Sequence, residues 1–104
     1  MHSQWSQISS TDYELTGALD RDEVPQLWAA LKQWQPKENT ITISLAAVER
    51  VDSAGMAMLI HLIENAKNQN CHIMYSFVPE QLLTLFKLSN VGSLVSEHLD
   101  IKQG

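Results

Sequence analysis

The residues best suited to chemistry are Asp52 and Ser53, which stand where an expected loop enters an expected helix. An aspartate at that place can cap the free backbone amides of the first helical turn without any further role. Ser53 can be a plain cap as well. Alternatively, its hydroxyl can carry a phosphate, which the unpaired amides and the helix dipole favour and the neighbouring Asp52 opposes. The pattern by itself leaves both interpretations open.

Two residue types just beyond Ser53 also suggest contacts. Gly55 permits either the close approach of another backbone or tight packing of a helix on a strand. Met56 and Met58 flank Gly55 and could form an adaptable contact surface, although methionines on helices usually fill the core. Both interpretations stay open for each of these residues.

The remaining sequence predicts no catalytic machinery, cofactor or metal site. Ser53 has no evident base beside it, and the chain lacks a Gly-x-Ser-x-Gly elbow or a Cys-His signature. Its four isolated glycines form no phosphate-binding loop, which argues against an NTPase or a kinase. The histidines lack metal-ligand spacing, and His61, on a polar helix face, is expected to be solvated. We therefore expect a protein that is not an enzyme.

Length and charge narrow the class of protein further. We expect residues 1–104 to form a single domain, because 104 residues fit one compact core. The net charge of −5, without any basic cluster, argues against nucleic acid and against direct adsorption onto anionic lipid. The most apolar segment, residues 54–66, is too short to span a bilayer. If a membrane matters, we expect a partner protein to supply the contact.

The first residues of the chain and its single cysteine favour the cytoplasm. Cys71 cannot form an internal disulfide, and it lies in an apolar run with Ile73, Tyr75 and Phe77 that is typical of a buried strand. Residues 1–5 lack the basic start and apolar stretch of a secretion signal. We therefore expect a cytoplasmic protein.

Hydrophobic periodicity predicts the elements that position these residues. Asp20 and Glu23 are spaced to satisfy the amides of a first helical turn, and Trp28 is expected on the core face of that helix. The predicted elements are a hairpin with strands on either side of residues 9–12, a helix from 24 to 34, a strand over 40–45 followed by a loop, a helix from 53 to about 70, a strand over 71–77 and a helix opening at 79–80. The tail from Val91 is not assigned.

The order of these elements predicts a mixed α/β sheet with right-handed crossovers. In such sheets, the loops that leave the carboxyl ends of parallel strands carry function. Residues 51–55 are therefore expected at one edge of the sheet.

Two motifs identify a family resemblance. The motifs are residues 15–20 (Leu-Thr-Gly-Ala-Leu-Asp) and residues 51–55 (Val-Asp-Ser-Ala-Gly), which resemble the STAS domain of sulphate transporters and anti-sigma factor antagonists. The resemblance covers nearly the whole chain. Trp28 and residues 60–67 and 83–88 look most similar to the small cytoplasmic STAS subunit of Mla phospholipid-transport ABC complexes. The resemblance implies a STAS fold, an α/β arrangement in which helices flank a mixed four- to five-stranded sheet in the order β-β-α-β-α-β-α.

The resemblance to the Mla subunit implies a docking function. In that subunit the loop at this position faces the ABC ATPase, whose assembly and activity depend on the subunit. The matching partner-binding residues here are Asp52, Ser53, Ala54, Gly55 and Met56. We therefore expect a subunit that binds the ATPase and, through it, the permease at the inner membrane, in a system that moves phospholipid to maintain outer-membrane lipid asymmetry. A homodimer is possible but not implied.

The resemblance to anti-sigma factor antagonists supplies the alternative function. There the serine that follows the motif aspartate is phosphorylated by a partner kinase, and it matches Ser53. Ala54 departs from both branches, since antagonists commonly carry a second hydroxyl residue and Mla subunits a glycine at that place. This departure favours contact over modification. A structural adaptor with no site beyond its fold is the third hypothesis.

Overall fold

The computed structural model describes residues 3–100. The expectation that residues 1–5 lack a secretion signal therefore falls partly outside the described residues. The strands are β1 (Trp5–Gln7), β2 (Asp12–Leu19), β3 (Thr40–Val51), β4 (His72–Ser76) and β5 (Leu99–Asp100). The helices are α1 (Val24–Leu31), α2 (Ser53–Lys67), α3 (Glu80–Leu88) and α4 (Gly92–Val95), the last followed by a 3₁₀ turn over Ser96–His98. Within residues 3–100, no helix is long and apolar enough to cross a bilayer.

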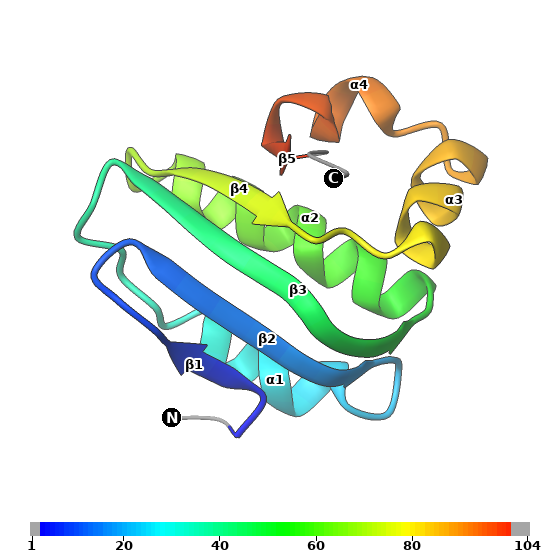
Figure 1. Cartoon of the computed structure of the whole chain (residues 1–104), viewed down its shortest axis with the longest axis horizontal. Helices are drawn as coiled ribbons and strands as arrows, with labels where there is room; N and C mark the ends of the chain where they lie inside the picture. The colour runs from blue at the N-terminus through cyan, green and yellow to red at the C-terminus, as the bar shows by residue number, and fades with distance from the viewer. Residues whose placement is uncertain (1–2, 101–104) are drawn as a thin grey trace.

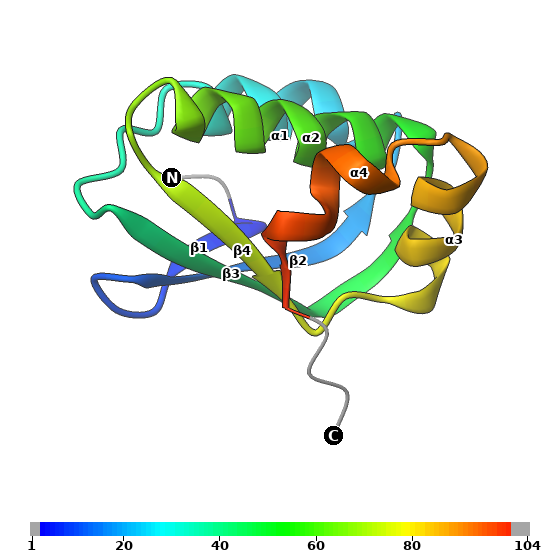
Figure 2. The ribbon, with the colours of Figure 1, turned by 90° about the horizontal axis from the view of Figure 1, so that it is seen from above.

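The five strands form one mixed sheet in chain order, which confirms the predicted α/β class (Figure 1). β1 pairs antiparallel with β2, and every later pair is parallel. Successive right-handed crossovers in one direction place their helices on the same face of a sheet. Accordingly, α1, α2 and α4 lie on one side of the sheet (Figure 2).

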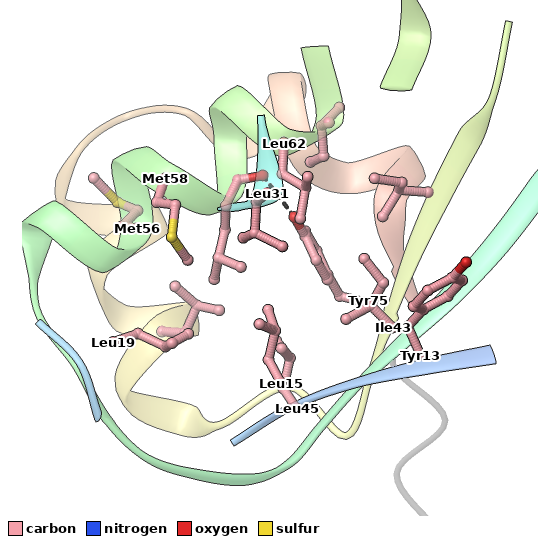
Figure 3. Close-up of a cluster of buried hydrophobic side chains, with 14 of the residues drawn as sticks. Tyr13, Leu15, Leu19, Leu31, Ile43, Leu45, Met56, Met58, Leu62 and Tyr75 are labelled. Atoms are coloured by element: carbon pink, nitrogen blue, oxygen red, sulfur yellow. Dashed lines mark hydrogen bonds between the residues drawn. The ribbon is translucent and has the colours of Figure 1, made fainter. Parts of the chain in front are cut away.

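The core lies between the sheet and the helices α1 and α2. Alternate strand residues point to the helices and are buried, while their neighbours form the partly exposed outer face. Leucines from β2 and β3 meet Met56, Met58 and Leu62 of α2 in this layer (Figure 3). Tyr75 donates its hydroxyl hydrogen to the Leu59 carbonyl oxygen at 2.6 Å, and burial raises the pKa of Tyr75 well above its usual value.

Two predicted boundaries around the first crossover are wrong. The strand expected over residues 40–45 continues to Val51, and no loop follows Leu45. Two register shifts against β2 give β3 extra residues, which break the alternation that marks a strand in sequence. The helix expected over residues 24–34 ends at Leu31. Trp34 therefore lies outside the helix, and its ring packs edge-on against the stacked rings of Trp5 and Tyr13.

The C-terminal segment adds a strand that the sequence did not predict. β5 has two residues, too few for a periodic signal, and it pairs with the end of β4. His98 is buried, and its Nδ1 lies 2.8 Å from the Ile73 carbonyl oxygen. The His98 ring stacks on His72, with 4.4 Å between ring centroids. These side-chain contacts hold the segment against β4.

The strand predicted over residues 71–77 is shorter in the structure, and Phe77 lies outside it. β4 covers only His72–Ser76, and Phe77 leaves the buried pattern with a φ of +53°. Its side chain is 71% exposed instead of buried.

Candidate functional site

The candidate site lies where β2 and β3 end side by side. Leu19 and Val51 are the last residues of these parallel strands and are partners in register. The following residues, Asp20 and Asp52, therefore lie at the same edge of the sheet. We call this region the α2 edge: residues 20–23, residues 49–54 and the start of α3.

Asp52 organises the start of α2. One carboxylate oxygen accepts hydrogen bonds from the backbone N–H of Ala54 at 2.9 Å and of Gly55 at 3.1 Å. The backbone carbonyl of Asp52 accepts the N–H of Met56 at 2.9 Å. The second carboxylate oxygen accepts the N–H of Arg21, from the loop after β2, at 3.0 Å. The predicted cap is confirmed, and the same side chain also joins two loops.

Asp20 performs the matching task in the loop after β2. One of its carboxylate oxygens accepts the backbone N–H groups of Asp22 and Glu23, at 3.1 and 3.0 Å, just before α1 begins. The other forms a fork with Arg50, which donates from Nη2 at 2.8 Å and from Nε at 3.1 Å. These hydrogen bonds, that of Arg50 first, hold the pKa of Asp20 below its usual value.

Gly55 brings α2 into direct contact with the backbone of β2. A Cβ atom at this position would lie 2.0 Å from the carbonyl oxygen of Leu19, far inside any real contact distance. The N–H of Asp52 donates to the same oxygen at 3.2 Å. Of the two interpretations left open for Gly55, tight packing of a helix on a strand is the one observed.

The five candidate partner-binding residues differ in what they show to solvent. Ser53 is exposed, and its hydroxyl has no hydrogen-bond partner among residues 3–100. Asp52 and Ala54 are half-buried. Gly55 and Met56 are buried, and so is Met58, so the methionines fill the core rather than form a contact surface. The surface of the candidate patch is therefore made by the first three residues.

Three residues that complete the edge were not singled out from the sequence. The backbone N–H of Arg21 and the guanidinium of Arg50 bind the two aspartates. Gln81 of α3 accepts the N–H of Val51 at 3.0 Å through its side-chain oxygen. Each bond joins residues about thirty positions apart, and only the strand register could have revealed it.

The α2 edge is strongly acidic. It carries six of the twelve acidic residues of the chain against two arginines, one of which pairs with Asp20. The acidic residues are Asp20, Asp22, Glu23, Glu49, Asp52 and Glu80. In the described part of the chain, no group of three His, Cys, Asp or Glu residues could hold a metal ion. The arrangement therefore offers negative charge on an ordered backbone.

Residues 6–96 match the family model described as Mlab, STAS domain. The chain belongs to the MlaB family of STAS domains. Its relatives include the intermembrane phospholipid transport system binding protein MlaB of Escherichia coli strain K12, 36% identical over 87 residues that cover 84% of this chain and 87% of that protein. The protein of the same description from Shigella flexneri matches with the same identity and coverage.

Solved structures agree with the STAS fold. The unphosphorylated anti-sigma factor antagonist SpoIIAA superposes with a TM-score of 0.69 at 17% identity, covering 93% of this MlaB-family chain and 84% of its own. A sulfate transporter family protein from Wolinella succinogenes gives a TM-score of 0.66 at 17% identity, with 90% and 78% covered. At this identity the likeness shows the fold alone.

Proposed function

We propose that this protein is a non-catalytic subunit of an Mla-type phospholipid transport system and docks on the ABC ATPase of that system through the α2 edge. The observation that carries the proposal is the exposed Ser53, held in place by a complete Asp52 cap. The family match and the MlaB relatives, which are described as binding proteins of an intermembrane phospholipid transport system, support the choice of system.

The α2 edge is rigid before any partner arrives. Asp52 satisfies the amides of Ala54, Gly55 and Met56, and Gly55 seats the helix directly on β2. A surface that is already ordered loses little conformational entropy on binding. Ala54 adds a small side chain beside Ser53, so another backbone can approach closely.

The negative charge of the α2 edge indicates what kind of ATPase surface would bind it. Six acidic residues at the edge favour a partner face rich in lysine or arginine, which speeds encounter and fixes orientation. The same charge disfavours direct contact with anionic lipid. The protein thus reaches the permease and the cytoplasmic side of the inner membrane through the ATPase.

Phosphorylation of Ser53 is the second candidate function, that of an anti-sigma factor antagonist. The free hydroxyl of Ser53 and the fold shared with SpoIIAA favour it. However, the Asp52 carboxylate already accepts the first-turn amides of Ala54 and Gly55, which would otherwise be available to a phosphate. A phosphate on Ser53 would keep mainly the repulsion from the Asp52 carboxylate. The local geometry therefore favours docking.

Affinity purification of the tagged protein from its native cells tests this assignment. The partners are identified by mass spectrometry, and the peptide containing Ser53 is analysed for phosphate in the same sample. We expect an ABC ATPase with its permease and an unmodified Ser53. Recovery of a serine kinase with phosphorylated Ser53 supports the antagonist function instead, and the absence of any ATPase contradicts docking.

A further inference from the structure

Phe77 combines two unfavourable features in one residue. Its ring is 71% exposed, and its backbone has a φ of +53°, in the left-handed region that a bulky side chain rarely adopts. The other non-glycine residues with positive φ among residues 3–100 are Asn70 and Asn90, which follow α2 and α3. Asparagine is common at such helix ends, whereas phenylalanine is not.

The backbone at Phe77 turns its ring away from the core. Ile73 and Tyr75 of β4 are buried on the helix-facing side, and strict alternation would place residue 77 beside them. The left-handed conformation ends the strand, and the next residue, Val78, is buried instead. A glycine would adopt this conformation without strain. Strained backbone conformations cluster at functional sites, and aromatic side chains dominate the energetics of interfaces.

The segment that carries Phe77 is continuous with the α2 edge. The pairing of β4 with β3 ends at Ser76 and Ser44, and residues 77–79 then lead from β4 to the start of α3 (Figures 1 and 2). α3 then contacts the end of β3, where Gln81 accepts the N–H of Val51. Glu80, three residues after Phe77, belongs to the acidic residues of the edge.

We propose that Phe77 is the hydrophobic anchor of the docking surface and inserts into an apolar pocket of the ABC ATPase whose rim carries basic residues. This inference rests on the proposed function and adds a residue to it. Buried aromatic residues surrounded by a polar rim carry much of the binding energy of protein interfaces. Glu80, at the start of α3 and three residues after Phe77, supplies acidic charge beside this residue.

The charge of the edge decides between this partner and two other occupants. A second copy of the chain would bring two acidic edges together, and like charges oppose that contact. A bilayer with anionic lipid would repel the same residues. An apolar pocket with a basic rim would bury the Phe77 ring and attract the acidic residues of the edge.

Two variants separate the ring from the backbone that holds it. Phe77→Gly removes the ring and the strain, and Phe77→Asn removes the ring while keeping a residue that tolerates positive φ. Ile8→Ala is the matched control, because Ile8 is 64% exposed on the hairpin turn before β2, away from the α2 edge. Both Phe77 variants are expected to fold, with thermal midpoints no lower than that of the wild type.

The test is a titration of each variant with the purified ATPase subunit by isothermal titration calorimetry. We expect the dissociation constant to rise about 10- to 100-fold for both Phe77 variants, as for truncation of an interface anchor, and less than about twofold for Ile8→Ala. If the wild type binds and the Phe77 variants bind equally well, the anchor is refuted while docking stands. If the wild type does not bind the ATPase, docking itself fails and this inference with it.

Discussion

The first turn of α2 rests directly on the end of β2, because the position where a Cβ of Gly55 would sit is 2.0 Å from the carbonyl oxygen of Leu19. The two residues are 36 positions apart in the sequence and belong to a helix and a strand. This contact fixes the height of the helix above the sheet. The exposed Ser53, two residues earlier, is thereby held at a defined place on the α2 edge.

Substitution of Gly55 is therefore expected to be severe. Gly55→Ala forces α2 away from β2 and lowers the free energy of unfolding by about 3 kcal/mol, at the upper end of overpacking effects. Gly92→Ala is the control, because a Cβ there meets nothing within 4 Å, and the change stays within about 1 kcal/mol of the wild type. Urea unfolding of both variants measures the difference, and equal stability would contradict the contact.

The cap predicts a graded series at the neighbouring positions. Asp52→Ala removes the acceptors of Ala54, Gly55 and Arg21 and lowers the free energy of unfolding by about 1 to 2 kcal/mol. Asp52→Asn keeps one acceptor oxygen, so we expect a smaller loss. Ser53→Ala changes stability by less than about 0.5 kcal/mol, because its hydroxyl makes no bond within the described chain. Thermal unfolding gives the order, and a larger loss for Ser53→Ala than for Asp52→Ala would contradict it.

The local parts of the fold were predictable from the sequence, and the parts set by register were not. The hairpin, α2 and the Asp52 cap carry their own signals in periodicity and in the residue type at the helix start. The second half of β3 lacks such a signal, because its register shifts against β2 break the alternation. β5 is held by pairing with β4 and by His98 rather than by its own two residues.

A pH dependence follows from the pair formed by Asp20 and Arg50. The folded-state pKa of Asp20 is lowered, so its contribution to stability is present above the unfolded value, about 3.9, and is lost as the pH falls through the folded value. Asp20→Asn is thus less stable than the wild type at pH 7, and the gap in thermal midpoint narrows below about pH 4.

Asp22→Asn, which removes an exposed carboxylate in the same loop, is the control for that series. Thermal melts from pH 7 to about pH 3 are compared for the three proteins. A gap between the wild type and Asp20→Asn that stays constant over this range would show that the pair with Arg50 does not contribute in this way.

The candidate site was predictable only in part, because some of its contacts are set by strand register and carry no local sequence signal. The sequence placed Asp52 and Ser53 at a helix start because residue type and position suffice there. It did not reveal Arg50 beside Asp20, since that pair depends on how β2 and β3 align. Phe77 followed an apolar alternation in the sequence, and only its backbone conformation shows that the ring faces solvent.

Binding to the ABC ATPase by Ser53 variants tests the central claim most directly. The purified ATPase subunit is titrated with the wild type, Ser53→Ala, Ser53→Asp and the control Ser10→Asp, which adds the same charge at an exposed serine in the hairpin turn. A new carboxylate beside Asp52 would be desolvated in the interface, so we expect Ser53→Asp to bind at least about tenfold more weakly. Ser53→Ala and Ser10→Asp should stay within about threefold of the wild type. Equal affinity of all four proteins would contradict docking through the α2 edge.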